Sequence, residues 1–461
     1  MITLSNVITI ENPSEELLKW CRQNLKLKNP EFVKKQRMHF WVGNTPEYLY
    51  LYETHGDKLV LPSGVFRNIF PMIDMNDTKV VFPVPEKVDY GCEIPLYDYQ
   101  EKAVEAVYWK QYGILQSAAG SGKTQMGIAL IAKWGRRALW LTHTKDLLTQ
   151  SKQRAEQYMD PSLLGTITEG KVNIGKGITF ATVQTMCNLD LAQYKGMWDV
   201  IIVDECHRVA GTPTAVSQFS KVLNSLAARH KYGLSATVHR SDGLIQATFA
   251  LLGDVVYTVP TEAVADKIMK VGICPVPTCI GLSRACLNTD GTLNYAKLIG
   301  YLAESDERNL RIIECIVENR ENPALILSDR LGHLEQLMSM LPADMREDAV
   351  MVSGKMTTKK GKAEREQAIA DMRTGKKRYL FATYSLAKEG LDVPRLERLY
   401  MATPQKDYAV ITQSIGRIAR TSKGKADPVV YDFVDDIQYL VKAYKKRCTT
   451  YRKNGCYFVE R

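Results

Sequence analysis

The residues most suited to chemistry form a loop of small side chains that ends in a lysine. Residues 117–124 read Ser-Ala-Ala-Gly-Ser-Gly-Lys-Thr and follow an apolar run that predicts a strand. Small side chains let consecutive backbone amides point at phosphate oxygens, and the start of the next helix adds positive potential. We therefore predict a phosphate-binding loop in which Lys123 reaches the terminal phosphates and Thr124 offers its hydroxyl to Mg²⁺. The predicted phosphate contacts are Ala119, Gly120, Ser121, Gly122, Lys123 and Thr124.

Two adjacent carboxylates follow a second apolar run. Residues 200–203 are Val-Ile-Ile-Val, and Asp204 and Glu205 come directly after them. Parallel α/β sheets bind ligands at the carboxyl ends of their strands, so the pattern predicts these acids beside the phosphate loop. Asp204 would then hold Mg²⁺, directly or through water, and Glu205 would orient and deprotonate the attacking water. The alternative for such a pair is an acidic helix cap.

A later segment offers positive charge for a phosphoryl transition state. Residues 413–420 read Gln-Ser-Ile-Gly-Arg-Ile-Ala-Arg, and the spacing of three predicts Arg417 and Arg420 on one helix face. If that face meets Lys123 across a cleft, the two guanidinium groups stabilise the γ-phosphoryl oxygens when the domains close, as an arginine finger does. A solvated arginine face is the alternative.

Short apolar runs that alternate with helical patterns predict two parallel sheets wrapped by helices. The expected strands are 114–116, 138–142, 178–182, 200–203 and 232–235 in the first sheet, and 324–328, 349–352, 379–382, 399–402 and 429–433 in the second. We therefore expect an α/β protein with doubly wound domains at residues 91–260 and 306–440. Residues 261–305 show no clear period and contain Pro275 and Pro277, which favours a linker or hinge.

The two ends of the chain follow other patterns. Tyrosine and leucine alternate over residues 48–52, and the Leu59–Pro62 run follows a turn signal, which predicts a β-hairpin. The basic and aromatic residues 34–41 either grip a nucleic-acid strand or fill the core of a small β-domain. We expect residues 1–90 to form a small α+β accessory domain that binds DNA, and residues 441–461 to form a basic helical tail.

The composition is that of a globular protein with a surplus of basic residues. The 461 residues allow two to four domains, and 45% hydrophobic residues exclude a disordered chain. The formal charge of +10 favours polyanions where the basic residues gather, as they do at 355–378 and 442–453, although each run alone equally suits a solvated helix face. The scattered cysteines favour reduced thiols, and Met1–Glu11 lacks a signal-peptide pattern, so we expect a cytoplasmic protein.

The motifs together resemble those of the superfamily 2 helicases and translocases of the DExH type, over residues 91 to about 435. The matching segments are 96–100 (Q motif), 117–124 (phosphate loop), 204–207 (DECH box), 235–237 (Ser-Ala-Thr motif), 383–392 (motif V) and 413–420 (QxxGRxxR of motif VI). Within this superfamily, the sequence resembles most the group of XPB, UvsW and RecG, in particular its compact phage or prokaryotic members.

This resemblance implies two tandem RecA-like domains and a motor that uses ATP and Mg²⁺ to step along nucleic acid. It adds Gln100, Gly390 and Asp392 to the nucleotide contacts, and Gln413 to the catalytic residues. It assigns the coupling of hydrolysis to domain movement to His207, Ser235 and Thr237. The implied nucleic-acid contacts are Thr142, His143, Thr182, Gln184, Arg240, Ser353, Gly354 and Thr383. Hydroxyl, amide and backbone groups of this kind suit sequence-independent phosphate contact.

We therefore expect a monomeric ATP-dependent DNA helicase or translocase that unwinds or remodels forked and branched DNA in replication, recombination or repair. Its expected protein partners belong to those processes, and a phage member would work in the host cytoplasm. An RNA helicase is an alternative, because backbone contacts do not by themselves distinguish sugars. The motor subunit of a restriction nuclease is another, with the nuclease in a partner protein. A non-catalytic clamp is disfavoured, because a pure binder needs no water activator.

Overall fold

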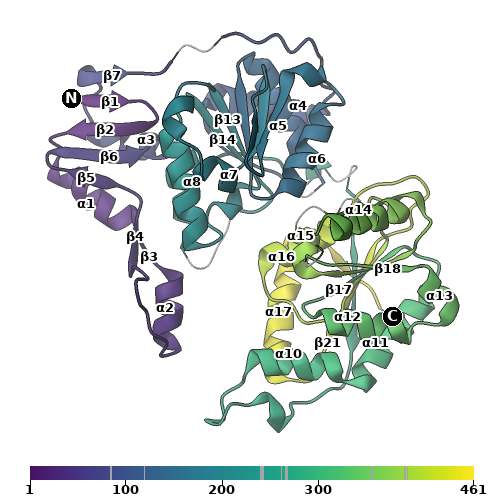
Figure 1. The fold of residues 1–461 in the computed structure, drawn as a ribbon. Coiled ribbons are helices and arrows are strands. Elements are labelled where there is room, and N and C mark those ends of the chain that lie inside the picture. The colour runs from purple at the N-terminus through teal and green to yellow at the C-terminus, as the bar shows by residue number, and fades with distance from the viewer. Residues whose placement is uncertain are drawn as a thin grey trace. The chain divides into compact units, whose positions relative to one another are not determined.

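The structure is a computed structural model (Figure 1). It describes residues 1–83, 86–118, 120–238, 243–260, 262–264, 268–354, 356, 358–388, 391 and 393–460. Contacts between residues divide the chain into two compact units, the first made mainly of residues 1–260 and the second mainly of residues 261–461.

The first unit begins with a small α+β domain. Its five-stranded sheet has the order β5-β6-β2-β1-β7. The elements are β1 (Ile2–Leu4), β2 (Val7–Glu11), α1 (Glu15–Asn24), β5 (Glu53–His55), β6 (Lys58–Pro62), α3 (Phe66–Ile69) and β7 (Thr78–Val80). β5 and β6 form an antiparallel hairpin around the predicted turn at residues 56–57. Leu59 and Leu61 are buried together with Val216 and Ala250 of the following α/β domain, so the two domains share one core.

An arm extends from this small domain (Figure 1). It consists of the two-stranded ribbon of β3 (Lys26–Lys28) and β4 (Tyr48–Tyr50) with the helix α2 (Pro30–Arg37) between them. The sequence places residues 48–52 in a hairpin with Leu59–Pro62, and that pairing is wrong: β4 pairs with β3 instead, and the hairpin partner of β6 is β5. The alternation of tyrosine and leucine identified a strand but could not identify its partner.

The first α/β domain is built on an eight-stranded sheet of order β11-β10-β12-β9-β13-β14-β8-β15, in which only the β10–β11 pair is antiparallel. Its strands are β8 (Gly113–Gln116), β9 (Ala138–Thr142), β10 (Leu164–Thr168), β11 (Lys171–Asn173), β12 (Ile178–Thr182), β13 (Val200–Asp204), β14 (His230–Ser235) and β15 (Val255–Thr258). Its helices are α4 (Asp98–Lys110), α5 (Lys123–Trp134), α6 (Lys145–Ala155), α7 (Val183–Cys187), α8 (Pro213–Ser225) and α9 (Ile245–Leu252). The central strands are buried on both faces, which explains their continuous apolar runs.

The helices of this domain cover both faces of the sheet, with α5 and α6 on one face and α7 and α8 on the other (Figure 1). Ile201 and Val203 of β13 pack with Phe219 and Leu223 of α8. On the opposite face, a Cβ added to Gly127 of α5 would lie 2.7 Å from the Trp140 ring, so only a glycine lets this helix seat so closely. The helix that follows the phosphate loop is thereby fixed against the sheet.

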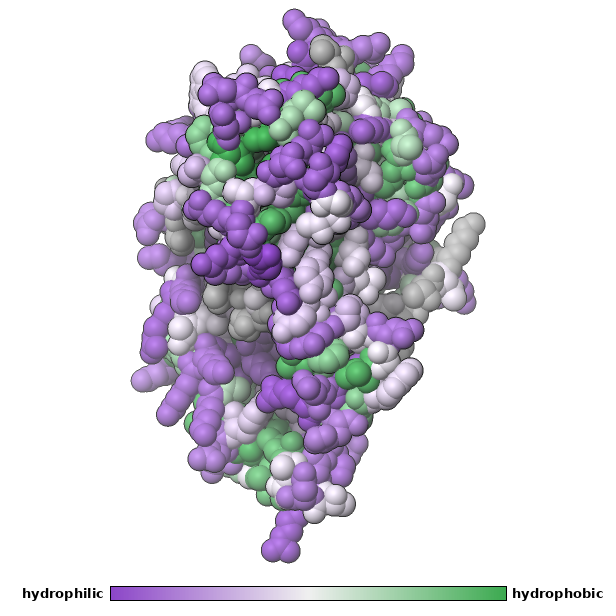
Figure 2. Space-filling model, turned by 90° about the vertical axis from the view of Figure 1, so that its left-hand side faces the viewer, coloured by the Kyte–Doolittle hydropathy of each residue, from purple (hydrophilic) through white to green (hydrophobic). Residues whose placement is uncertain are grey.

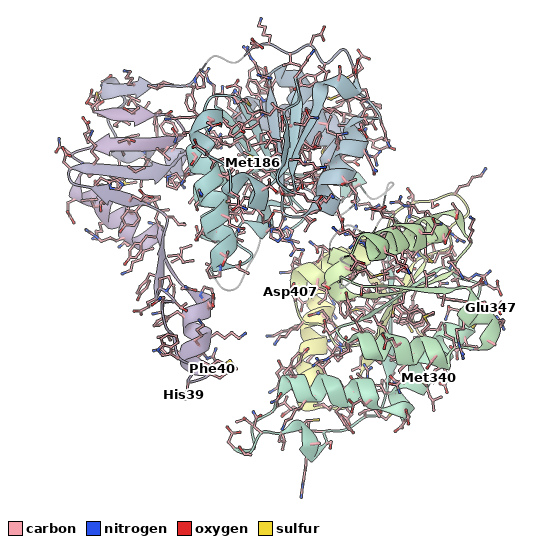
Figure 3. All side chains as sticks on the ribbon, in the orientation of Figure 1. His39, Phe40, Met186, Met340, Glu347 and Asp407 are labelled. Carbon is pink, nitrogen blue, oxygen red and sulfur yellow. The ribbon has the colours of Figure 1, made fainter. Side chains whose placement is uncertain are left out.

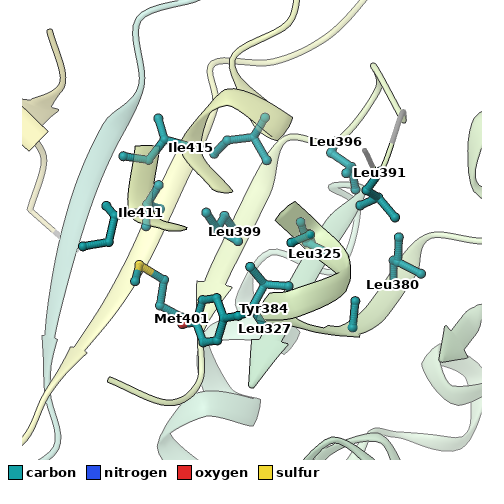
Figure 4. Close-up of a cluster of buried hydrophobic side chains, with 14 of the residues drawn as sticks. Leu325, Leu327, Leu380, Tyr384, Leu391, Leu396, Leu399, Met401, Ile411 and Ile415 are labelled. Carbon is teal, nitrogen blue, oxygen red and sulfur yellow. The ribbon is translucent and has the colours of Figure 1, made fainter. Parts of the chain in front are cut away.

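The second unit is an α/β domain with a seven-stranded parallel sheet of order β18-β19-β17-β20-β21-β16-β22. Its strands are β16 (Gly272–Pro277), β17 (Ala324–Ser328), β18 (Ala349–Val352), β19 (Tyr379–Thr383), β20 (Arg398–Met401), β21 (Val429–Val434) and β22 (Tyr457–Phe458). Its helices are α10 (Tyr295–Glu304), α11 (Asp306–Glu318), α12 (Leu331–Met340), α13 (Ala343–Glu347), α14 (Lys359–Thr374), α15 (Tyr384–Lys388), α16 (Tyr408–Ile418) and α17 (Gln438–Lys453). Two buried clusters lie on its faces, and one joins Leu327 and Met401 of the strands to Ile411 and Ile415 of α16 (Figure 4).

Two segments of the second unit differ from the sequence predictions. Within residues 261–305, expected as a linker, β16 pairs with β21 and β22, and α10 forms a complete helix. Proline is tolerated in β16 because β22 pairs only with Gly272 and Ile273, which leaves Pro275 and Pro277 at an edge of the sheet. The expected basic tail is also packed into this unit: α17 buries Tyr451 and Arg447, whose Nε and Nη2 donate to the Asp432 carboxylate at 2.8 and 2.9 Å.

The surface seen in Figure 2 is mostly hydrophilic, with apolar side chains in separate small patches. Among the helices that the structure describes, none has the length and apolar character needed to cross a membrane. All ten cysteines are free.

Candidate nucleotide and nucleic-acid sites

The phosphate loop connects β8 to α5 at the carboxyl edge of the first α/β sheet. Gly120 and Gly122 have φ values of +87° and +80°, a backbone region that favours glycine. The Lys123 side chain is buried, and its Nζ lies 3.4 Å from the carbonyl oxygens of Ser117 and Ala118. The lysine is therefore folded back over the loop, at the start of the helix, where a phosphate would accept its hydrogen bonds.

The glutamine of the predicted Q motif contacts the same loop. Gln100 is buried in the first turn of α4, and its Oε1 accepts a hydrogen bond from the backbone N–H of Tyr97 at 3.0 Å. A Cβ added to Gly122 would lie only 2.3 Å from Gln100 Nε2. The glycine thus gives the amide room to lie directly against the phosphate loop.

The two carboxylates of the DECH segment stand at the end of β13, and β14 separates β13 from β8 in the sheet. Asp204 is buried, and its oxygens accept hydrogen bonds from the Glu205 N–H at 2.9 Å and the Ser151 hydroxyl at 3.3 Å. Burial raises the pKa of Asp204, the neighbouring Glu205 charge raises it further, and Lys123 lowers it. A cation beside this pair would remove the electrostatic cost of keeping both acids ionised.

Glu205 occupies an unusual backbone conformation. Its φ and ψ are 48° and 50°, in the left-handed region that non-glycine residues seldom adopt. Such conformations cost about 1–3 kcal/mol and cluster at functional sites. The two acids have different partners, because Asp204 accepts from the Ser151 hydroxyl whereas Glu205 Oε2 lies 3.3 Å from His207 Nδ1.

The DECH segment is hydrogen-bonded to the Ser-Ala-Thr segment. His207 Nδ1 lies 3.0 Å from Ser235 Oγ and 3.3 Å from Glu205 Oε2. The Ser235 hydroxyl donates to the Thr237 carbonyl at 2.7 Å and accepts from the Thr237 N–H at 3.2 Å. Because the Ser235 hydroxyl donates its proton to the Thr237 carbonyl, the hydrogen between His207 Nδ1 and Ser235 belongs to Nδ1. The Nδ1–H group therefore faces both Ser235 Oγ and Glu205 Oε2. The three residues to which the resemblance assigns coupling are therefore in direct contact.

The expected nucleic-acid contacts of the first unit lie at the ends of two neighbouring strands. Thr142 and Thr182 are register partners at the carboxyl ends of β9 and β12. The Thr142 hydroxyl donates to the Thr144 carbonyl, and the Thr182 hydroxyl is hydrogen-bonded to the Thr185 hydroxyl. Gln184 Nε2 lies 3.2 Å from His143 Nδ1, and burial together with the positive charge of Arg208 lowers the pKa of His143.

The expected contacts of the second unit also share one edge of a sheet. Ser353 directly follows β18 and Thr383 is the last residue of the adjacent strand β19, and Thr383 Oγ1 lies 2.9 Å from Ser385 Oγ. Gly354 is exposed beside Ser353. The predicted residues Ala119, Arg240, Gly390 and Asp392 lie outside the described residues.

The motif VI residues begin within α16, whose first turn is capped by the Asp407 carboxylate accepting from the Val410 N–H at 2.9 Å (Figure 3). Gln413 is buried, and Arg417 Nε donates to the Ala387 carbonyl at 2.9 Å. The prediction that Arg417 and Arg420 share a helix face is wrong, because α16 ends at Ile418 and Arg420 instead forms a β-bridge with Ile268. A spacing of three identifies a common face only while the helix continues.

The described residues contain no group of three or more metal-binding side chains. The residues at the carboxylate pair nevertheless suit Mg²⁺. Mg²⁺ usually takes one or two protein ligands together with substrate phosphates and water. The buried Asp204 carboxylate and the Thr124 hydroxyl in the first turn of α5 are donors of this kind. Sequence reasoning did not identify Ser151, whose hydrogen bond fixes Asp204, because a serine in the polar pattern of α6 carries no distinguishing signal.

Comparison with known proteins identifies the same two domains. The family "Type III restriction enzyme, res subunit" matches residues 93–240, and "Helicase conserved C-terminal domain" matches residues 307–422. A putative ATP-dependent RNA helicase of Acanthamoeba polyphaga mimivirus is 24% identical, over 92% of this chain and 78% of the relative. The DNA 3'-5' translocase XPB2 of Sulfurisphaera tokodaii is also 24% identical, over 72% of this chain and 80% of the relative.

A solved structure shows the same fold at low identity. Saccharomyces cerevisiae Dbp5 bound to RNA and ADP BeF3 has a TM-score of 0.55 and 17% identity, and the match covers 87% of this chain and 94% of Dbp5. The two α/β domains are therefore RecA-like domains in tandem. Together with the matching families, this places the chain among the superfamily 2 helicases, in the group that includes XPB, as a nucleic-acid-dependent ATPase of the helicase type.

Proposed function

We propose that this helicase is a DNA motor that unwinds or remodels forked and branched DNA in replication, recombination or repair. The observation that carries the proposal is the cluster of the buried Lys123 and Asp204 with the half-buried Glu205 at one edge of the first sheet. This cluster has the charges needed to bind and hydrolyse a nucleoside triphosphate. The XPB2 relative is named a DNA translocase, which supports DNA as the track.

In the proposed mechanism, Gln100 and the loop at residues 120–124 hold the nucleotide. Thr124 and Asp204 would hold a Mg²⁺ ion, which would neutralise phosphate charge. Glu205 accepts a proton from the attacking water, whose oxygen forms the new bond to the γ-phosphorus as the bond to the β–γ bridging oxygen breaks. We assign Arg417, Arg420 and Gln413 to stabilising the γ-phosphoryl oxygens when the domains close. Gly390 and Asp392 add nucleotide contacts from the second domain.

Coupling to movement follows from the contacts of His207. The loss of the γ-phosphate changes the environment of Glu205, and the shared Nδ1 proton transmits that change to Ser235 and Thr237.

We assign contacts with the nucleic-acid strand to residues of both domains. They are Thr142, His143, Thr182, Gln184 and Arg240 in the first domain, and Ser353, Gly354 and Thr383 in the second. Alternating grip by the two sets would move the protein along the phosphate backbone.

The decisive experiment measures the ATPase rate with single-stranded, duplex, forked and four-way DNA, and with matched RNA forks. We expect forked or four-way DNA to stimulate most. Equal or stronger stimulation by RNA would refute the DNA assignment, and simple duplex as the best activator would refute the role on branched DNA.

The motor of a restriction enzyme is a second candidate, because the family that matches the first α/β domain is described as the res subunit of type III restriction enzymes. Such a motor would translocate on unbranched duplex and would require a nuclease partner. Stimulation by long linear duplex, with no preference for forks, distinguishes it.

A further inference from the structure

The arm of the N-terminal domain is a rigidly built element. The Asn29 side chain is buried, caps α2 by accepting from the Glu31 N–H at 3.0 Å, and donates to the Pro46 carbonyl at 2.8 Å. Lys35 Nζ donates to Thr45 Oγ1 at 2.7 Å, which ties the helix to the loop segment that precedes β4. The loop between them therefore has a defined path.

That loop displays large apolar side chains to solvent at the end of α2. Trp41 is 87% exposed, Phe40 is 60% exposed and Met38 is 49% exposed. His39 has φ +53°, and the backbone N–H of Phe40 donates to the Lys35 carbonyl at 2.9 Å, so the chain turns sharply after the helix. Figure 3 shows His39 and Phe40 at the tip of the arm. A fixed loop that keeps aromatic rings in water loses the free energy of their burial unless another molecule covers them.

The arm that carries these rings is rich in basic side chains. Between residues 26 and 50 the arm carries Lys26, Lys28, Lys34, Lys35 and Arg37, against Glu31 and Glu47. Lys28 pairs with Glu47, and Lys35 with Glu31, whereas Lys34 and Arg37 make no ion pair within the described part of the chain. Both unpaired cations are exposed and lie three residues apart on α2. The arm thus offers positive charge beside exposed aromatic faces.

A groove runs beside the loop. Its volume is about 590 Å³, and it is lined on the arm by Lys35, Trp41 and Thr45, and on the first α/β domain by Pro213 and Ser217 of α8. A Cβ added to Gly43 would lie 2.8 Å from the Trp41 ring, so the indole rests against the glycine with its other face open. An exposed aromatic ring at the edge of a groove, with basic side chains nearby on the same arm, is an arrangement that suits stacking on an unpaired base.

We propose that the loop at residues 38–45 stacks Phe40 and Trp41 on unpaired bases of a nucleic-acid strand, while Lys34 and Arg37 contact its phosphates. The arm would hold the end of an opened duplex and prevent its re-pairing. This inference rests on the proposed function, because only a motor that opens duplexes presents unpaired bases to the arm.

The test compares the binding of the full-length chain to oligothymidylate and to an abasic oligomer of the same length, which keeps the phosphates and removes the bases. We expect the wild type to prefer oligothymidylate by about tenfold, equivalent to about 1.4 kcal/mol. The double variant Phe40→Ala/Trp41→Ala should bind both oligomers equally. Lys34→Ala/Arg37→Ala should keep the preference, and should lower the slope of log affinity against log salt by about 1.4 for two lost phosphate contacts.

Trp109→Ala is the matched control, since this indole is 72% exposed on α4, away from the arm. It should leave the preference and the ATPase rate unchanged. The inference is overturned if the wild type binds both oligomers equally, or if Phe40→Ala/Trp41→Ala keeps the preference, as it would if the rings served a protein partner. The proposed function fails separately, when no nucleic acid stimulates the wild-type ATPase.

Discussion

His207 Nδ1 lies 3.0 Å from Ser235 Oγ, and this contact joins the DECH segment at the end of β13 to the Ser-Ala-Thr segment at the end of β14. The Ser117 N–H donates to the Ser235 carbonyl at 3.0 Å, so Ser235 also touches the first residue of the phosphate loop. One residue thereby contacts both halves of the nucleotide site within a single domain.

Ser235→Ala removes the acceptor for His207 while leaving the backbone contact to Ser117 in place. We expect the ATPase rate to change little and duplex unwinding to fall by about tenfold, the equivalent of ~1.4 kcal/mol in a coupling step. Parallel ATPase and strand-separation assays measure the ratio. Equal losses in both activities would show that Ser235 supports hydrolysis itself.

Glu205→Gln keeps the size of the side chain and removes its ability to accept a proton. Because a positioned general base contributes about 10²- to 10⁴-fold, ATP turnover should fall within that range. Binding of ATP and DNA should persist, as measured by filter binding. Glu347→Gln, at the exposed end of α13 (Figure 3), is the control and should turn over normally. Normal turnover by Glu205→Gln would disprove its assigned role.

Arg420→Ala removes a cation that we assign to the transition state. Arginine fingers contribute about 10³-fold or more, so kcat should fall by that order while nucleotide affinity changes much less. Stopped-flow binding of a fluorescent ATP analogue separates the two quantities. Arg311→Ala, which removes an exposed ion pair with Glu314, should change neither. A loss confined to affinity would contradict the assignment.

The second domain contains a buried histidine that should make it sensitive to acid. His333 Nε2 donates to Asn309 Oδ1 at 2.8 Å, and Nδ1 accepts from the Ser328 hydroxyl at 3.0 Å, so the neutral ring fully satisfies this site. Burial, and then the charge of Arg308, lower the pKa of His333 to about 3. A second ring proton would face a hydroxyl whose oxygen already accepts from the Arg330 N–H.

The unfolded chain binds this proton near pH 6.5, whereas the folded chain does not. The contribution of neutral His333 to the free energy of unfolding is therefore fully present above pH 6.5 and decreases as the pH falls toward 3. We expect a decrease of about 1.4 kcal/mol per pH unit, or about 2 kcal/mol in total by pH 5. Urea unfolding of wild type and His333→Gln between pH 7 and 4.5 measures it. The variant should be less stable at pH 7 and show a flatter pH dependence, whereas parallel curves would contradict the prediction.

The sequence allowed the strands that carry the nucleotide site to be predicted, because their physical signal is local. Residues 200–203 form a continuous apolar run since β13 is buried on both faces, and the acids follow directly at its end. The tandem RecA-like fold was confirmed by the comparisons. The functional roles of the individual site residues are still predictions.

The remaining errors concern information that a local pattern does not contain. Arg447 counted as a basic surface residue, yet it pairs with Asp432, which lies 15 residues earlier and becomes its neighbour only through the fold. The prolines of β16 suggested a linker because the sequence does not reveal that this strand lies near a sheet edge. The helix end at Ile418 separated two arginines whose spacing alone suggested a common face.

The left-handed conformation of Glu205 has an evolutionary consequence. Glycine adopts this region without a steric penalty, so Glu205→Gly would favour the folded protein at that position while abolishing the chemistry we assign to it. A lineage released from selection for turnover would drift toward glycine or asparagine there. An acidic residue retained at this turn in a descendant chain would therefore indicate that selection for turnover had continued.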